Sequence, residues 1–432
     1  MACISTAKAG KMTSRFPSTL LLFSIGWFVT IGLGIIGLVL IALAIPLALR
    51  NRPNRVHPAA LGFSIIALLY FAYWAIGGWF FPPMDNYWDS ISRILPVLVL
   101  GALPLVLQTE IGAQNHRHYW FYLASVAGVV TLLATVSLSE IIDGNSRAAG
   151  FHGNALLAGS GLLVGVMMPF SIWHRLSFPL QILFVILFAL TFLTAFMFVE
   201  ARASSLILLV TGGPILTCLI LAKIKGRNRW IWRLAVFTTI CVLAIAALYF
   251  VLEISEHRAV VRMRNGIIEL LQSLQQQNNG QTLRDKSVSA RALMWQQAWL
   301  AIQEAPIWGH GVHHRFDAVD ETLFRRFGPS FTHLHNSVLN HAVGGGLVGV
   351  GFYITLTFYP LLFFAYTRWR APSYWLDMSP SLRREILWLG LLVTAIPFFT
   401  GLSNVVMFES TLATIALVPL AYWVMRLPVL KR

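Results

Sequence analysis

Apolar runs of about 20 residues recur along most of this 432-residue chain, and they restrict its fold more than any other feature. A helical run of this length matches the ~30 Å hydrocarbon core of a bilayer. Only 11% of the residues are charged, where a soluble domain has about 25%, and 57% are hydrophobic. The sequence therefore predicts an all-α polytopic membrane protein.

The lysines and arginines between the apolar runs predict the membrane topology of the chain. Lysines and arginines flank the first run, 20–49, on both sides, so we expect it to cross twice and both clusters to be cytoplasmic. The further expected spans are 58–81, 94–109, 119–139, 154–173, 177–198, 204–222, 233–252, 337–367, 385–403 and 408–426. This predicts about 12 transmembrane helices with both termini cytoplasmic.

The expected spans divide the chain into three parts. Residues 1–252 hold transmembrane helices 1–9, residues 253–335 form one long external segment, and residues 336–432 hold helices 10–12. The net charge of +15 fits cytoplasmic loops and anionic headgroups, so we expect membrane lipids and no nucleic acid as partners. Neither a Walker A loop nor an HExxH motif occurs, and we expect no nucleotide, metal or other cofactor.

The long external segment contains an amphipathic pattern over 289–305. Ser289 is expected to cap the N-terminus of this helix and Pro306 to end it. Trp295 and Trp299 fall on one face, together with Ile302. This face can lie on the membrane surface or pack on the helix bundle, and we favour packing.

Cations of chemical interest lie at the outer ends of helices, at Arg147, Arg202 and Arg291. A single arginine there commonly reaches headgroups or pairs with an acid. Three that converge suit a lipid pyrophosphate, because guanidinium binds phosphate oxygens bidentately and stays charged. Ionisable residues are nearly absent from the span interiors, which argues against an ion-coupled transporter.

His335 stands at the start of the tenth expected span, two residues after His333. A lone histidine there is often structural, but a pKa near 6.5 suits proton transfer at neutral pH, and a helix N-terminus favours anions. At this position His335 can be structural, or it can act as a base, as an orienting group or as a contact to a leaving phosphate, and we expect His333 to be structural. The five glycines in 344–351 predict helix packing.

A polar loop contains His310, His313, His314 and Asp317. A metal site is one interpretation of this cluster. We favour solvent or sugar contacts, with His313 a candidate substrate contact, because adjacent histidines in a polar loop more often serve that way.

Four segments occur in a recognisable order: "SRAAGFHGNALLAG", "ARASSLILLVTGG", "ARALMWQQAWLAIQEAPIWGHGVHHRF" and "HLHNSVLNHAVGGGLVG". This succession, within residues 120–410, resembles the O-antigen ligase and polymerase (WaaL/Wzy) family of bacterial envelope enzymes. The resemblance implies a GT-C-like glycosyltransferase of the bacterial inner membrane with its active site facing the periplasm. Such an enzyme moves a glycan from undecaprenyl pyrophosphate to an acceptor hydroxyl without metal or ATP.

The resemblance also implies roles for single residues. It assigns Arg202 and Arg291, and by extension Arg147, to pyrophosphate binding, and His335 to catalysis. Asn154 and Asn336 in the quoted segments are further candidate substrate contacts.

Members of the family differ in their acceptor. A ligase attaches O-polysaccharide to lipid A–core, whereas a polymerase extends a second lipid-linked repeat. Polymerases typically carry two arginine-rich external loops, so one long external segment favours a ligase. The short tail after the last span disfavours a protein-glycosylating member. A transporter of lipid-linked glycans is the alternative from another class, and it requires a polar path that the apolar span interiors do not offer.

Overall fold

The computed structural model describes about two fifths of the chain. The described residues are 57–80, 87–111, 176–193, 286–311, 333–402 and 410–427, with Ser171, Trp173, Val319, Val406, Met407 and a few isolated positions between 231 and 268. Every regular element in these residues is a helix. The expected all-α class is confirmed for this part of the chain.

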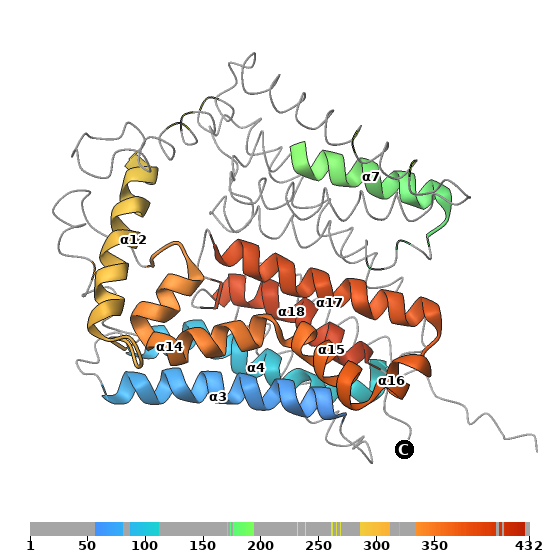
Figure 1. Cartoon of the computed structure of the whole chain (residues 1–432), viewed down its shortest axis with the longest axis horizontal. Coiled ribbons are helices and arrows are strands. Elements are labelled where there is room, and N and C mark those ends of the chain that lie inside the picture. Colours follow the sequence, from blue (N-terminus) through green and yellow to red (C-terminus); the bar gives the residue numbers. More distant parts are fainter. Residues whose placement is uncertain are drawn as a thin grey trace, which may run out of the picture.

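The helices are labelled as in Figure 1. They are α3 (Pro58–Phe80), α4 (Tyr87–Ile111), α7 (Phe178–Leu193), α12 (Lys286–Glu304), α14 (Ser337–Thr357), α15 (Tyr359–Arg370), α16 (Pro372–Leu376), α17 (Pro380–Gly401) and α18 (Ser410–Arg426). Among the described residues, Pro58–Gly77 and Ser337–Thr357 are long and apolar enough to cross a membrane. The count of 12 spans and the GT-C architecture remain predictions.

Helices α3, α4, α14, α15, α17 and α18 pack into one bundle, and α12 runs across one end of it rather than along it (Figure 1). Large aromatic side chains fill the bundle core, among them Trp74, Tyr353 and Trp423, all nearly inaccessible to solvent. Helix α4 packs on α3 at Gly101, where an added Cβ would stand 2.2 Å from that of Ala67. Small residues therefore set the spacing of this helix pair.

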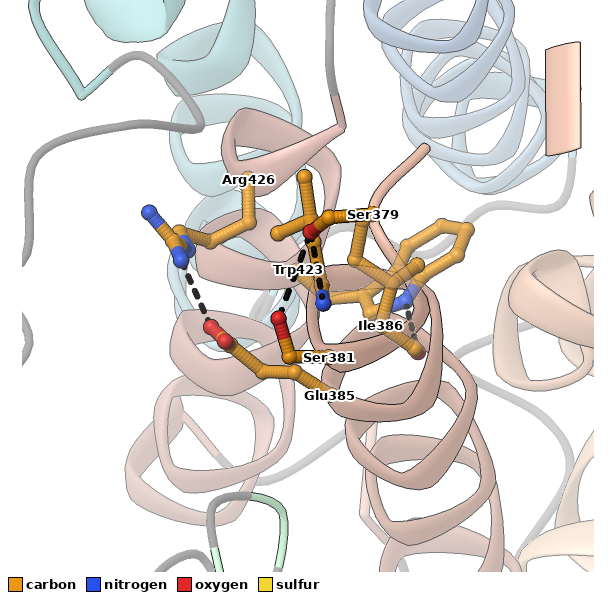
Figure 2. A network of polar contacts seen from close by, with 7 residues as sticks. Ser379, Ser381, Glu385, Ile386, Trp423 and Arg426 are labelled. Atoms are coloured by element: carbon orange, nitrogen blue, oxygen red, sulfur yellow. Dashed lines mark hydrogen bonds and ion pairs between the residues drawn. The ribbon is translucent and has the colours of Figure 1, made fainter. Parts of the chain in front are cut away.

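Helices α17 and α18 are joined at the end of the bundle opposite α12. Arg426 donates from Nη2 to Oε1 of Glu385 across 2.6 Å, with both side chains only 1% exposed (Figure 2). Trp423 donates from Nε1 to the carbonyl of Ile386 (2.9 Å). These two contacts fix the last turns of α18 against the first turns of α17.

The apolar run 337–367 is not the single span predicted from the sequence. Helix α14 bends at Gly346 (φ 55°, ψ −152°), and Phe358 separates α14 from α15. The bend brings the ring of His341 onto that of Tyr353 at 4.6 Å between centroids. Residues 12 apart in a straight helix are separated by ~18 Å. The first half of α14 therefore folds back against the second half.

A turn that follows α12, residues 305–311, fills the bend of α14. In a regular helix, the N–H groups of Leu347 and Val348 would donate to the carbonyls of Val343 and Gly344. Here all four groups bond to the α12 turn instead. The bonds run from Leu347 to Pro306, from Val348 to Ile307, from His310 to Val343 and from Gly311 to Gly344, at 2.8, 3.3, 2.8 and 2.8 Å. The backbone N–H and carbonyl groups freed by the bend are therefore hydrogen-bonded, and the bend carries no desolvation cost at these positions.

Candidate functional site

Helix α12 approaches the bundle with a different face from the one predicted. Met294, Ala298 and Ala301 are buried and pack against Leu334 and Val343. The small side chains of Ala298 and Ala301 allow α12 to approach α14 closely.

The predicted packing of the tryptophan face on the bundle is wrong for Trp299, which is 59% exposed. Helix α12 also begins at Lys286, so Ser289 lies inside the helix and is not its N-cap. The helix does end at Glu304, before Pro306, as the sequence predicted.

Trp295 connects α12 to the segment that precedes α14. Its Nε1 donates to the carbonyl of Leu334 across 3.1 Å. Arg291 lies one turn before Trp295 on the same side of α12. This connection therefore holds Arg291 beside the segment that carries His335, although 44 positions separate the two in the sequence.

His335 adopts a left-handed backbone conformation, with φ 49°. Its N–H donates to Nδ1 of His333 (3.3 Å), and the two rings meet edge to face at 4.1 Å between centroids. A non-glycine residue at positive φ is uncommon, and such conformations concentrate at functional sites. His333 thus supports the conformation of His335, which agrees with its predicted structural role.

The structure changes the expected ionisation of His335. Burial is the largest cause, and together with the electrostatic effects of His333 and Arg291 it lowers the pKa of His335 from 6.5 to about 3. From the sequence we expect a pKa near 6.5, because burial and neighbours distant in the chain cannot be predicted from a local motif. His335 is therefore a neutral imidazole at physiological pH, able to accept a hydrogen bond.

The start of α14 is fastened to the connection between α17 and α18. Asn336 caps α14 by accepting the N–H of Leu339 on Oδ1 (3.1 Å), and its Nδ2 donates to the carbonyl of Leu402 (3.4 Å). Ser337 accepts the N–H of Val406 on Oγ (2.8 Å). Both ends of the Asn336 amide have structural partners, and its contact with substrate remains a prediction.

The role of His341, inside α14, was not predicted from the sequence. His341 is fully buried, and its Nδ1 donates to the carbonyl of Ser337 at 2.5 Å. Its Nε2 consequently accepts from the hydroxyl of Tyr70 on α3 (2.9 Å). The only signal in the sequence was a histidine inside an apolar run, four residues after Ser337. This pair fixes the folded-back half of α14 on α3.

The remaining candidate residues differ in what the structure says of them. Arg147, Arg202, Asn154 and His313 lie outside the described residues. His310 is described, and it donates from Nε2 to the carbonyl of Ala301 across 2.8 Å. Of the residues predicted to act together, the structure thus brings Arg291 close to His335.

These features define a class of protein in which the described residues are helical, α3 and α14 have the length and composition of membrane helices, and Arg291 lies close to His335 where α12 meets one end of the bundle. Residues 187–354 match the family model described as O-antigen ligase. This match confirms, for this part of the chain, the resemblance to the O-antigen ligase family seen in the sequence. The matched region includes Arg202, Arg291 and His335.

A comparison with curated proteins finds a shorter similarity. An 85-residue segment is 36% identical to a Haemophilus influenzae protein described as an uncharacterized protein. The similarity covers 19% of this chain and 21% of that relative. The chain therefore matches about a fifth of the length of this relative, whose description names no activity.

Proposed function

We propose that this protein is an O-antigen ligase, which transfers O-polysaccharide from undecaprenyl pyrophosphate to a hydroxyl of lipid A–core at the periplasmic face of the inner membrane. The proximity of Arg291 to His335 carries this proposal, because it joins an anion-binding group to a hydrogen-bond acceptor within the family match. Arg202 and Arg147 are proposed as further pyrophosphate ligands.

The proposed step exchanges one bond for another at the anomeric carbon. The acceptor oxygen forms a bond to this carbon, and the bond to the pyrophosphate oxygen breaks with its electron pair leaving on undecaprenyl pyrophosphate. The acceptor proton passes to His335 or to the departing pyrophosphate. Direct displacement inverts the anomeric centre. Arg291 stabilises the charge that develops on the leaving group.

The low pKa of His335 fits this chemistry in a specific way. An imidazole with a pKa of about 3 is a weak base on its own, but it is always unprotonated before substrate binds. Bound pyrophosphate adds negative charge next to Arg291, and this charge raises the pKa of His335. Donor binding therefore strengthens the base at the moment when it is needed.

A reconstitution experiment tests the proposal. Purified protein is mixed with undecaprenyl-pyrophosphate-linked glycan and lipid A–core, without nucleotide or added metal. We expect glycan-capped lipid A–core. Linked repeats without capped core indicate the alternative, a Wzy-type polymerase. Disappearance of donor from one leaflet of proteoliposomes without any new glycosidic bond indicates a lipid-linked glycan transporter.

Replacing Arg291 by Lys tests the residue that carries the proposal. Lysine keeps the charge but lacks the bidentate fork, so the KM for donor is expected to rise about 10- to 100-fold. Arg384→Lys, at the exposed start of α17 on the opposite end of the bundle, is the matched control and leaves the KM unchanged. An unchanged KM in Arg291→Lys would remove Arg291 from the donor site.

A further inference from the structure

Helix α12 and the α12 turn expose an apolar surface next to α14, a helix of membrane-like apolar composition. Trp299, Ile307 and Trp308 are 59%, 55% and 64% exposed. Leu347, just after the bend of α14, is 71% exposed, and its N–H is bonded to the α12 turn at Pro306. Exposed apolar side chains that gather in this way mark a contact surface rather than a solvated one.

The same surface continues onto α3. Tyr73 of α3 donates its hydroxyl to the carbonyl of Gly345 (2.8 Å) and lies 3.4 Å from that of Trp308. One turn further along α3, near its end, Ile76 is 56% exposed. Helix α3 is long and apolar enough to cross a membrane, and α14 also has an apolar composition although it folds back at Gly346. The exposed side chains of the α12 turn therefore adjoin faces that acyl chains would cover.

The exposed side chains of α12 form a tryptophan stripe and a mixed side, on which Leu300 (48% exposed) precedes Glu304 by one turn. Arg291, Trp295 and Trp299 follow each other at four-residue spacing and form one stripe beside the buried stripe. Glu304 is exposed and projects about 140° away from Trp299 around the helix axis. Tryptophan is the residue favoured at the boundary of headgroups and acyl chains, whereas a carboxylate is favoured in water.

We propose that α12 is an interfacial helix, with Trp299, Ile307 and Trp308 embedded among the phospholipids of the leaflet at the His335 end of the bundle. The continuity with α3 and α14 selects lipid over a protein partner. Arg291, two turns before Trp299 on the same stripe, is then held at the level of lipid phosphates. This inference concerns the position of α12 and does not depend on the transfer reaction.

Spin-label accessibility tests the proposal. In a background with Cys3, Cys218 and Cys241 replaced by Ser, a nitroxide is placed at Trp308→Cys, at Trp299→Cys or, as the matched control, at Glu304→Cys. Each protein is reconstituted into liposomes of phosphatidylethanolamine and phosphatidylglycerol. Power saturation then compares collisions with oxygen, which concentrates in the bilayer, and with a neutral water-soluble nickel complex.

At positions 299 and 308 we expect an oxygen-to-nickel collision ratio several-fold higher than at position 304. Ratios at positions 299 and 308 as low as that at position 304 would overturn the proposal, because these positions then lie in water. Exclusion of both reagents from position 308 would also overturn it, because another protein or a second copy of the chain then covers the surface. Trp299 and Trp308 are exposed, so their replacement leaves the core intact, and unchanged gel-filtration profiles verify this.

Discussion

Gly309 lies so close to Gly346 that a Cβ on Gly309 would stand 2.6 Å from the backbone nitrogen of Gly346. Both residues have positive φ, 67° and 55°. The two glycines therefore meet where the α12 turn enters the bend of α14. This contact connects the helix that carries Arg291 to the helix that follows His335.

Gly346→Ala is expected to destabilise the protein strongly. The conformation at Gly346 costs a residue with a side chain about 1–3 kcal/mol, and its Cβ would also meet the carbonyl of Ile307 at 2.3 Å. Gly351→Ala is the matched control, because a Cβ there meets nothing within 4 Å and alanine favours the helix. Thermal unfolding in detergent should show a lower midpoint for Gly346→Ala and an equal or higher one for Gly351→Ala. Equal midpoints in both variants would contradict the bend.

His335→Asn separates the side-chain role of His335 from its backbone conformation. Asparagine tolerates the left-handed region better than alanine, so this variant removes the imidazole with little backbone strain. If the imidazole takes part in proton transfer, the transfer rate falls by about 10²-fold or more while the unfolding midpoint changes little. Rates measured at saturating donor and acceptor check this. Full activity in folded His335→Asn protein would exclude the catalytic role.

The pH dependence of transfer should reveal the low pKa of His335. Only the neutral imidazole accepts a proton, so activity that depends on His335 is lost as pH falls through its pKa, about 3 in the free protein. Bound pyrophosphate raises this pKa, so the acid limb of kcat should lie at higher pH than that of kcat/KM. In His333→Asn, one cause of the low pKa is gone, and the kcat/KM limb should move to higher pH. A movement to lower pH would contradict the assignment.

The buried ion pair of Glu385 and Arg426, at the end of the bundle opposite α12, is expected to contribute to stability. Glu385→Leu leaves the guanidinium buried without its carboxylate, and we expect a loss of about 3–5 kcal/mol. Glu385→Leu combined with Arg426→Met removes both charges and should recover most of this stability. Unfolding midpoints of the single and double variants measure the difference. A double variant less stable than Glu385→Leu alone would show that the pair has another role.

Much of the helical framework could be predicted from the sequence, and the bend of α14 could not. The apolar runs 58–81 and 408–426 correspond to α3 and α18 within two residues at each end, because length and hydropathy are local properties. The glycines in 344–351 predicted close packing, which Gly345 and Gly346 confirm. The same glycines are equally compatible with a straight helix, and the turn that fills the bend comes from a distant segment.

The sequence predicted which residues belong to the candidate site, but not their proximity or the pKa of His335. Arg291 and His335 were selected separately, and the contact of Trp295 with Leu334 that holds them together has no local signature. The buried stripe of α12 was misassigned because Ala298 and Ala301 signal less strongly in sequence than Trp299. The pKa of His335 depends on burial, which only the tertiary structure supplies.

The four bonds between the α12 turn and α14 use main-chain atoms alone. Main-chain bonding places few demands on the side chains of residues 305–311, apart from Gly309 and Gly311, whose positive φ favours glycine. Related proteins can therefore keep this junction while their sequences diverge at it, and alignments will understate the similarity there. A search for distant relatives should weight the glycine positions and the spacing between helices above overall identity.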